Sequence, residues 1–586
     1  MQYEKLVTIY ESLGSTQKRL EKTKYLAAFL RSLKPPAKET LLLLQGRVFP
    51  IWVNKVLGVS TQLIVKALAS STGTTPAKVT SMWKETGDLG ESARRLVKRS
   101  SQSSLASYGS TDDSGSSLSV HKIYSNLTKI ADLTGQGSVD RKISLISQLL
   151  SMAKPKEALY IVRTVLEDLR VGVAEGTFRD ALVWAFFGDE IGIDLSEDNP
   201  EIRERERYNE LSAMVQRAID VTNDPGEVFE TLHEKGSEGI SKIRLKVGKP
   251  VKVMLAIKAK DVADSFSRVG SPAQFELKYD GFRAQIHKKK DTVTVFTRRL
   301  ENVTAQFPDI VKAAKSHIKG DGIFDCEAVG YDASDKTFLP FQSISQRIRR
   351  KYDIEDMARK YPVEVNVFDV LAYEGDELLA QPFTKRREIL EKAIKAEEYV
   401  LKPSEKTITD DEETIRSFFN RAVKEGNEGL MAKRLDAPYQ PGARVGHMVK
   451  IKAIKETLDL VIVQAEWGEG KRANWLSSFT LACVDNGSFV TIGKVGTGIK
   501  EKEEFEVSFS RLTEMLRPAI TKEEGRTAHV RPSVVVEVAY EELQKSPTYQ
   551  SGYALRFPRI IAIREDKPAE EATSLGYIKE IYEQQT

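Results

Sequence analysis

A lysine stands at the join between two short strand-like segments, FELK and FRAQIH, in residues 275–287. Apolar residues alternate with polar ones on both sides of Lys278, as in half-buried strands, and Asp280 and Gly281 interrupt the pattern. A lysine amine attacks phosphorus only after losing its proton, so a nucleophilic lysine requires neighbouring cations, a bound metal or desolvation. By itself the K-x-D-G sequence is weak evidence for a nucleophilic lysine, because a hairpin turn with an exposed lysine also explains it.

Charged and aromatic residues follow the lysine in an ordered series, most of them within or beside strand-like segments. The series runs through FTRRLENVTAQFPDI, IFDCEAVGYD, VNVFDVL, EGNEGLMAKRLDAPYQPGAR, HMVKIK and RFPRIIAIREDKP. The residues that could do chemistry in these segments are Arg298, Glu327, Phe368, Glu428, Lys433, Arg444, Lys450, Lys452, Arg564, Asp566 and Lys567. The complete series is far less expected by chance than the tetrapeptide alone.

Composition limits the class of protein. The chain has 586 residues with 41% hydrophobic content, enough for three or four domains of about 150 residues each. Its 88 Lys and Arg nearly balance 84 Asp and Glu, so the net charge of +4 permits basic faces for nucleic acid without requiring them. The two cysteines, Cys326 and Cys483, exclude a disulfide framework and a four-cysteine zinc site.

Targeting signals are absent from the sequence pattern. The first residues lack the basic-then-apolar layout of a signal peptide, and no segment approaches the ~18 consecutive apolar residues of a membrane span. We therefore predict a cytoplasmic protein, associated with the nucleoid if the organism is prokaryotic, that makes no use of a membrane.

The hydrophobic pattern changes twice along the chain. Apolar residues recur at helical spacing through residues 1–245, apart from a Ser-, Gly- and Asp-rich stretch at 99–117 that predicts a solvated loop. Residues 246–453 alternate strand-like segments with charged helices such as 384–398, which predicts an α+β region. Residues 454–586 combine short strands with Gly-rich turns, which predicts a small β-barrel. The predicted strands include 292–297, 323–332, 363–370, 458–467, 488–496 and 534–543.

The ordered series resembles the six motifs of the covalent nucleotidyltransferases, which comprise DNA ligases, RNA ligases and capping guanylyltransferases. It is most similar to the archaeal and eukaryotic replicative ATP-dependent DNA ligases, and the likeness extends over nearly the whole chain. LLLLQGRVFPIW, KPKEALYIVRTVLEDLRVGVAEGT and VKVMLA look like segments of that family's DNA-binding domain and of the start of its catalytic core. The resemblance implies an all-α DNA-binding domain at 1–245, an α+β adenylation domain at 246–453 and a β-barrel OB-fold domain at 454–586.

Resemblance to the ligases implies that Lys278 attacks the α-phosphate of ATP, forms a lysyl-AMP phosphoramidate and releases pyrophosphate. AMP then passes to the 5′-phosphate at a nick in double-stranded DNA, and the 3′-hydroxyl attacks with release of AMP. The chemistry is consistent, because a phosphoramidate keeps the adenylate activated and protonation of its nitrogen makes lysine a good leaving group. The family serves DNA replication, repair and recombination.

The resemblance also implies a nucleotide site around this lysine. Glu276 points to the same strand face as Lys278, and its carboxylate would accept a hydrogen bond from the adenine amine. Phe368 would stack on the adenine ring. The cations implied for the ribose and phosphate oxygens are Arg283, Arg298, Arg444, Lys450 and Lys452. The last two share a strand face and would also help Lys278 to lose its proton.

Two further groups complete the implied site. Glu327 and Glu428 are the Mg²⁺ partners, because a hard cation held by a few carboxylates neutralises charge on phosphate oxygens; Glu327 also counts among the nucleotide-binding residues. In the third region, Arg564 and Lys567, on either side of Asp566, would orient pyrophosphate when the OB-fold domain closes.

Alternative functions share parts of the pattern. An RNA ligase or a capping guanylyltransferase also carries K-x-D-G, but the long helical region at 1–245 disfavours both. An NAD⁺-dependent ligase is disfavoured by the lack of a four-cysteine zinc site. A non-catalytic DNA-binding scaffold descended from a ligase is disfavoured by the intact acidic and basic motifs.

The loop contains a hypothetical partner site. QSSLASY places Gln102, Leu105 and Tyr108 at its first, fourth and seventh positions, a degenerate form of the sliding-clamp-binding peptide that related ligases carry near here. We hypothesise that Gln102–Tyr108 bind a sliding clamp. The main partner expected is nicked double-stranded DNA, and the chain is expected to be a monomer.

Overall fold

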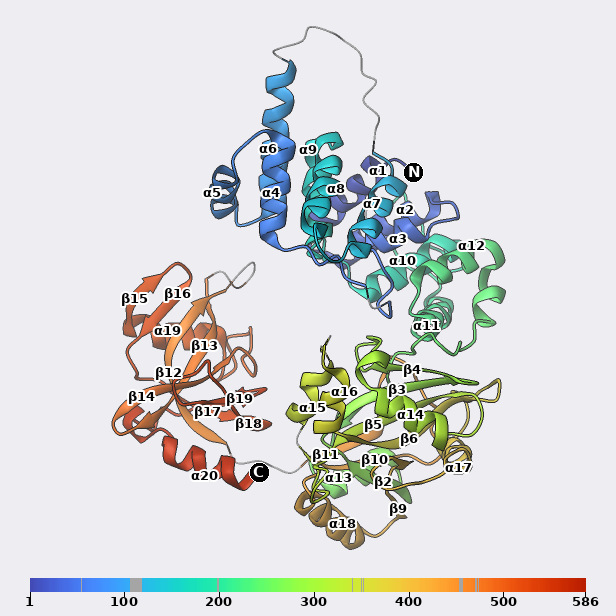
Figure 1. The fold of residues 1–586 in the computed structure, drawn as a ribbon, viewed down its shortest axis with the longest axis vertical. Coiled ribbons are helices and arrows are strands. Elements are labelled where there is room, and N and C mark those ends of the chain that lie inside the picture. Colours follow the sequence, from blue (N-terminus) through green and yellow to red (C-terminus); the bar gives the residue numbers. More distant parts are fainter. Residues whose placement is uncertain are drawn as a thin grey trace. The chain divides into compact units, whose positions relative to one another are not determined.

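The computed structural model describes residues 1–586 with the exception of residues 54, 106–117, 198–199, 340, 349, 351, 453–456, 469–471, 473 and 586. The side chains of residues 98–105, 342 and 584–585 also lie outside the described set. Contacts divide the chain into two compact units, Met1–Lys452 and Ala453–Thr586 (Figure 1). The first unit contains both the helical region and the first region with strands. The division into domains at 1–245, 246–453 and 454–586 remains a prediction.

Helices build the N-terminal part of the first unit. Several begin with side-chain caps: Thr75 accepts from the backbone N–H of Lys78, and Ser119 accepts from that of Lys122. Fully buried aromatic residues, including Trp184 and Phe229, lie in the apolar core that these helices share. The helices are α1 Tyr3–Gly14, α2 Arg19–Ser32, α3 Lys38–Leu44, α4 Thr61–Thr72, α5 Pro76–Thr86, α6 Leu89–Leu105, α7 Val120–Asp132, α8 Ser138–Met152, α9 Pro155–Val165, α10 Glu175–Phe187, α11 Arg205–Thr222 and α12 Pro225–Ser241.

Helix α6 corrects the predicted loop at 99–117. The helix continues to Leu105, so the loop prediction is wrong for residues 99–105. Once a helix is nucleated, each further residue adds a hydrogen bond at little cost, so the apolar stripe of α6 carries it into the serine-rich stretch. Gln102 and Leu105 fall in its last turns with their side chains outside the described set, and Tyr108 lies outside the described residues.

Two β-sheets with covering helices form the rest of the first unit. One sheet has the strand order β1-β11-β10-β2-β9, and the other has the order β4-β3-β5-β6-β7 with β8 paired to β6. The strands are β1 Leu255–Lys258, β2 Ala273–Lys278, β3 Phe282–Lys289, β4 Thr292–Thr297, β5 Gly322–Gly330, β6 Val363–Tyr373, β7 Asp376–Glu377, β8 Leu401–Pro403, β9 Lys406–Thr409, β10 Gly429–Lys433 and β11 Arg444–Lys452. The helices are α13 Val262–Val269, α14 Pro308–His317, α15 Phe341–Ile348, α16 Ile354–Lys360, α17 Phe383–Ala393 and α18 Glu412–Lys424.

One face of each sheet packs in an apolar core with its own covering helices. Phe275 on β2 packs with Phe418 on α18, whereas Phe282 on β3 packs with Phe307 and helix α14. Because side chains alternate along a strand, the residues next to these apolar ones point to the opposite faces. Those opposite faces carry the charged residues of the predicted site.

The segment before β1 is fastened to strand β3. The backbone N–H of Gly248 donates to Nδ1 of His287 at 2.9 Å, and the backbone N–H of Val251 donates to Oε1 of Gln285 at 2.7 Å. His287 and Gln285 are two residues apart and therefore share one face of the strand. The chain that leaves the helical part is thus held against the second sheet.

The second unit is rich in strands. Its main sheet has the order β14-β13-β12-β16-β15, with β17 joining β12 to β20, and β18 pairs separately with β19. The strands are β12 Leu458–Trp467, β13 Leu476–Asp485, β14 Ser488–Val495, β15 Ile520–Glu524, β16 Thr527–Val530, β17 Val535–Ala539, β18 Glu542–Lys545, β19 Tyr553–Arg556 and β20 Arg559–Ile563. Helices α19 Phe509–Leu516 and α20 Leu575–Gln585 accompany them. The helical N-terminal region and β-rich C-terminal region predicted from the sequence are confirmed.

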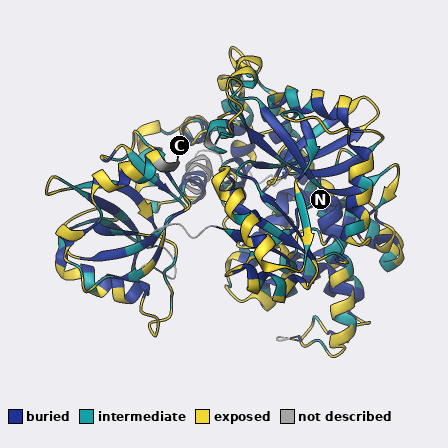
Figure 2. Ribbon diagram, turned by 90° about the horizontal axis from the view of Figure 1, so that it is seen from below, coloured by how far each residue is buried: buried dark blue, intermediate teal, exposed yellow. Residues whose placement is uncertain are grey.

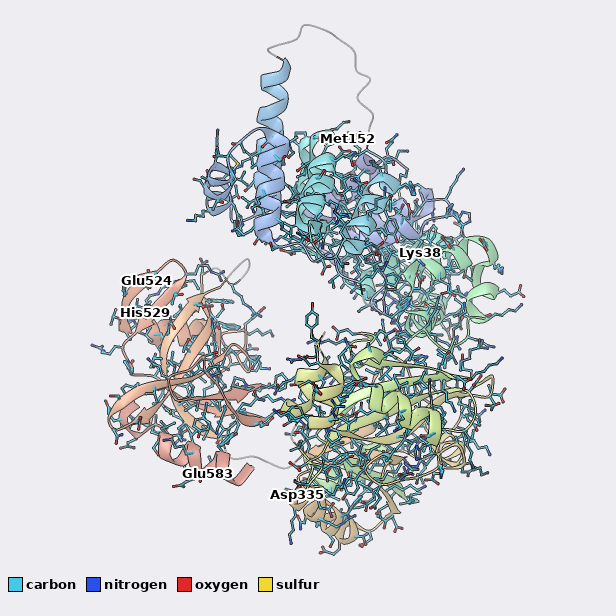
Figure 3. All side chains as sticks on the ribbon, in the orientation of Figure 1. Lys38, Met152, Asp335, Glu524, His529 and Glu583 are labelled. Carbon is cyan, nitrogen blue, oxygen red and sulfur yellow. The ribbon has the colours of Figure 1, made fainter. Side chains whose placement is uncertain are left out.

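Burial follows this organisation. Figure 2 shows the strands of both units largely buried and the outer helix faces exposed. Strand β15 is instead largely exposed, and Oε2 of Glu524 at its end lies 3.7 Å from Nε2 of His529 on β16 (Figure 3). None of the helices in the described part of the chain has both the length and the hydrophobicity of a membrane span.

Candidate active site

Lys278 is the last residue of β2, and its side chain forms an ion pair. Its Nζ lies 2.8 Å from Oε2 of Glu428, and Nζ of Lys452 lies 2.7 Å from the same oxygen. The sheet register explains this arrangement, because Gly429 on β10 pairs with Lys278 on one side and with Lys452 on the other. Glu428 directly precedes β10, so its carboxylate bridges two lysines from the two strands that flank β10.

The bridging carboxylate is held firmly in its ionised form. Burial acts to raise the pKa of Glu428, but the charges of Lys278 and Lys452 outweigh it and lower this pKa to about 2. The Lys278 amine is engaged by this carboxylate. Lys278 must therefore leave Glu428 before its amine can act as a nucleophile.

Glu327 lies in a row of polar side chains across the second sheet. On β5 it pairs in register with Arg283 on β3 and with Asn366 on β6. Burial raises the pKa of Glu327 to about 7, against the opposing charges of Lys278 and Arg283. Glu428 also raises it, which places the two carboxylates within electrostatic reach of each other.

These two carboxylates fit a magnesium ion. Mg²⁺ takes oxygen ligands and usually keeps several waters, so one or two carboxylates together with nucleotide phosphates suffice. Among the described residues, no group of three or more acidic, histidine or cysteine side chains could hold a metal. A cation beside Glu327 would also stabilise its ionised form, which burial disfavours.

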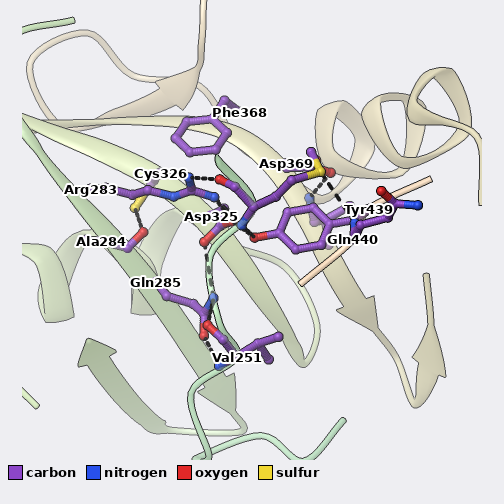
Figure 4. Close-up of polar contacts among 12 residues, drawn as sticks. Val251, Arg283, Ala284, Gln285, Asp325, Cys326, Phe368, Asp369, Tyr439 and Gln440 are labelled. Carbon is purple, nitrogen blue, oxygen red and sulfur yellow. Dashed lines mark hydrogen bonds and ion pairs between the residues drawn. The ribbon is translucent and has the colours of Figure 1, made fainter. Parts of the chain in front are cut away.

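Arg283 is fixed by a buried network that the sequence did not reveal (Figure 4). Its Nη2 lies 2.6 Å from Asp325 and donates to the hydroxyl of Tyr439 at 3.1 Å, while its Nη1 donates to the carbonyl of Met254 at 2.8 Å. The Tyr439 hydroxyl donates to Asp325 at 2.7 Å and accepts from the backbone N–H of Met254. The Arg283 Nε is buried without a hydrogen-bond partner among the described residues.

Phe368 lies at an irregularity of β6. The register between β5 and β6 shifts between Asp325 and Cys326, which leaves Phe368 at a β-bulge. Bulges re-aim a side chain and are common beside functional sites. The guanidinium of Arg283 lies 5.1 Å from the centre of the Phe368 ring, and Nζ of Lys433 lies 4.8 Å from it.

Glu276 is almost fully buried, with 2% of its surface exposed. Its Oε2 lies 2.7 Å from Nζ of Lys433, and its Oε1 accepts from Nε2 of Gln274 at 2.7 Å. Burial lowers the pKa of Lys433, although the charge of Glu276 opposes this. The predicted adenine-contacting residue is thus already engaged within the protein, by a lysine that belongs to the ordered series of motifs but received no specific role from the sequence.

The remaining predicted residues lie in several places. Lys450 precedes Lys452 by two residues on β11 and pairs in register with Met431. Arg298 directly follows β4, and Arg444 begins β11; both are exposed. In the second unit, Arg564 and Lys567 both bind Asp459, at 2.9 Å and 2.7 Å.

Sequence reasoning missed Asp325 and Tyr439. Asp325 was detectable, because it lies two residues before Glu327 and therefore on the same face of the same strand. Tyr439 lies in an irregular segment between β10 and β11, where no periodicity marks a functional side chain.

Family models match most of the chain. The N-terminal model of DNA ligases matches residues 2–183, the ATP-dependent DNA ligase domain matches 253–452, and the C-terminal region of ATP-dependent DNA ligases matches 472–567. The architecture and these matches together define a multidomain ATP-dependent ligase.

Relatives of the same length support this classification. A DNA ligase of Nanoarchaeum equitans is 46% identical over 100% of this chain and 99% of its own, and one of Thermococcus fumicolans is 41% identical over 99% and 98%. A solved structure described as Pmar-Lig_PreS3 has a similar fold, with 15% identity, a TM-score of 0.53 and coverage of 95% of this chain and 99% of that one. The chain belongs to the ATP-dependent DNA ligase family, which confirms the resemblance inferred from its motifs.

Proposed function

We propose that this chain seals nicks in double-stranded DNA through a lysyl-AMP intermediate on Lys278. The observation that carries the proposal is the position of Lys278 at the end of β2. Its amine pairs with the carboxylate of Glu428 and acts electrostatically on the carboxylate of Glu327, which lies on the other sheet. A nucleophile, charge-stabilising groups and an aromatic ring are thereby joined in one polar region. A nucleotidyl transfer requires groups of these three kinds.

Each residue of the proposed site has a separate role in the first step, the formation of lysyl-AMP. Lys278 leaves Glu428 and attacks the α-phosphate, while Lys450 and Lys452 bind the oxygens on which negative charge increases. Arg283 uses its unpaired Nε toward the ribose, and Arg298 and Arg444 contribute further contacts to ribose and phosphate. Glu276 and Phe368 receive the adenine, the first at its amine and the second by stacking.

Mg²⁺ is the proposed metal, and Glu327 and Glu428 are the side chains that would hold it. When bound, it would neutralise charge on the phosphate oxygens of ATP. Glu428 pairs with Lys278 and Lys452 in the structure, so Lys278 has to leave this carboxylate before it attacks.

The second unit would serve the same step. We propose that it is an OB-fold domain and that Arg564 and Lys567 orient the pyrophosphate leaving group. Both residues bind Asp459 in the structure, so they would have to exchange this carboxylate for phosphate oxygens. Asp566, which pairs with Arg564 at 2.9 Å, would keep the guanidinium oriented during the exchange.

Labelling with [α-³²P]ATP tests the proposal. The protein should form an acid-labile, covalently labelled band, transfer the label to a nicked duplex and seal the nick. Lys278→Arg should abolish all label, because a guanidinium cannot become the required nucleophile. Lys289→Arg, at the exposed end of β3, is the matched control and should label normally. An unlabelled wild-type protein would contradict the proposal.

The same assay separates the alternatives. Label from GTP in preference to ATP would favour a capping-type guanylyltransferase, and sealing of a nicked RNA strand in preference to DNA would favour an RNA ligase. We expect ATP and DNA to be preferred, with the protein active as a monomer in sedimentation.

A sliding clamp is the proposed protein partner. Replacing Gln102, Leu105 and Tyr108 with Ala should remove clamp binding in a pull-down with a purified clamp while leaving self-adenylation intact. Unchanged binding would remove the hypothesis.

A further inference from the structure

We infer that Lys433 is a positioning residue that sets the selection of adenine over other bases. This inference rests on the proposed nucleotide site around Lys278 and adds a determinant of its specificity. Lys433 ends β10, and its side chain is 7% exposed. Its Nζ lies 2.7 Å from Oε2 of Glu276 and 4.7 Å from the ring centre of Phe383.

The burial of this lysine needs a functional explanation. A buried ion pair costs desolvation of both charges, and well-packed apolar residues are often as stable at the same positions. Lys433 is nevertheless enclosed by Glu276 and by the rings of Phe368 and Phe383. Such an arrangement gives little stability, but it fixes the direction of the Glu276 carboxylate.

Lys433 also connects the two sheets at the nucleotide site. β10 and β2 are neighbours in the first sheet, whereas Phe368 lies on β6 of the second sheet. Lys433 pairs with Glu276 in its own sheet and donates to the Phe368 carbonyl, at 3.4 Å, in the other. A single ammonium group therefore sets the spacing between the carboxylate proposed to read the base and the ring proposed to stack on it.

This spacing matters for base selection. A carboxylate distinguishes bases only if its free lone pair meets the donor on the base edge, because hydrogen bonds weaken steeply with poor geometry. Oε2 of Glu276 is occupied by Lys433, and Oε1 accepts from Gln274 at 2.7 Å and from Arg387 at 3.4 Å, so these three partners decide where the remaining lone pairs point. The cation beside Phe368 also draws electron density from the ring, which favours stacking on an electron-rich purine.

Lys433→Met tests the inference, because it keeps the length of the side chain and removes its charge. Self-adenylation is measured with ATP and with purine riboside triphosphate, which lacks the 6-amino group. The wild type should prefer ATP by at least about tenfold in kcat/KM, as expected of a site that pairs with that group. Lys433→Met should raise the KM for ATP, change kcat less, and bring the preference to within about twofold. Lys433→Arg keeps the charge and should retain part of the preference.

A matched control separates positioning from stability. Lys402 pairs with the fully buried Glu364 at 3.2 Å, on β8 and β6 of the second sheet, and among the described residues its ion pair is with Glu364 rather than with Glu276. Lys402→Met should lower the thermal midpoint to a similar extent as Lys433→Met and leave the preference for ATP unchanged. If Lys433→Met fails to fold, Lys433→Gln, which retains an amide donor, takes its place with the same expected direction.

The outcomes are distinct. Equal losses with both nucleotides in Lys433→Met, or no preference for ATP in the wild type, would overturn the inference while the proposed function stands. Absence of any covalent nucleotide on the wild-type protein would instead contradict the proposed function.

Discussion

At the scale of single residues, the site depends on partners that share atoms. One oxygen of Glu428 serves two lysines, and one hydroxyl of Tyr439 serves Asp325, Arg283 and a backbone N–H. Groups that share an atom in this way act as a unit, so the loss of one member leaves the others with unsatisfied polar groups. The effects of substitutions here will not be additive.

Tyr439→Phe is expected to destabilise the first unit. Removing the hydroxyl leaves the backbone N–H of Met254 without its acceptor and takes one donor from buried Asp325, at a cost of about 1–3 kcal/mol. The measurement is the denaturant concentration at the midpoint of the unfolding transition of the first unit. Tyr352→Phe, where the ring is 78% exposed, is the control and should leave the midpoint unchanged. Equal midpoints for Tyr439→Phe and the wild type would show that the network carries little stability.

At the scale of elements, strand β3 joins two parts of the first unit. One face of β3 packs in the core of its sheet, while Arg283, Gln285 and His287 on the other face bind the segment at 248–254. Since alternation along a strand separates these two tasks, the sequence predicted both faces. It did not predict what the polar face would bind.

His287 should make the stability of this junction depend on pH. Its Nδ1 accepts from Gly248, so the neutral ring is required, and burial lowers its pKa from 6.5 to about 3. The unfolded chain therefore binds a proton that the folded chain does not, below about pH 6.5. The contribution of the neutral His287 ring to the free energy of unfolding is fully present above that pH. It falls as the pH decreases toward 3, by roughly 1.4 kcal/mol per pH unit at most.

The comparison is between unfolding free energies measured from pH 7 to pH 4.5. His287→Gln should show a shallower decline than the wild type, whereas His121→Gln, at an exposed position, should follow the wild type. The same slope in all three proteins would mean that His287 is not the group responsible.

The predicted elements also show which local signals are reliable. The strands predicted at 292–297 and 458–467 coincide with β4 and β12: the first alternates apolar and polar residues, and the second contains a short continuous apolar run. The segment at 534–543 was predicted as one strand but forms β17 and β18, which pair with different strands. A continuous apolar pattern does not reveal where a strand changes its partner.

At the scale of the whole molecule, residues from both compact units are assigned to the first chemical step. Arg564 and Lys567 belong to the second unit and Lys278 to the first. The proposed role of Arg564 and Lys567 concerns only the step in which pyrophosphate leaves, so their loss should slow that step more than the steps that follow it.

Arg564→Ala should separate those steps. Formation of lysyl-AMP from ATP should slow by about 10²-fold, because a cation that stabilises charge on the leaving group is lost. Sealing of a nick that already carries AMP should change by only a few-fold, since no pyrophosphate leaves in that step. Lys579→Ala, exposed on α20, is the control for both assays. Equal slowing of the two steps would contradict the assignment to pyrophosphate.

The sequence by itself determined the family, the order of the motifs and the polar face of each strand, because these depend on residue identity and on alternation between near neighbours. Only the tertiary structure decided which groups meet. Tyr439 and Asp325 are 114 residues apart and Lys433 and Glu276 are 157 apart. Their contacts result from strand register and from the packing of two sheets, and no local pattern encodes either.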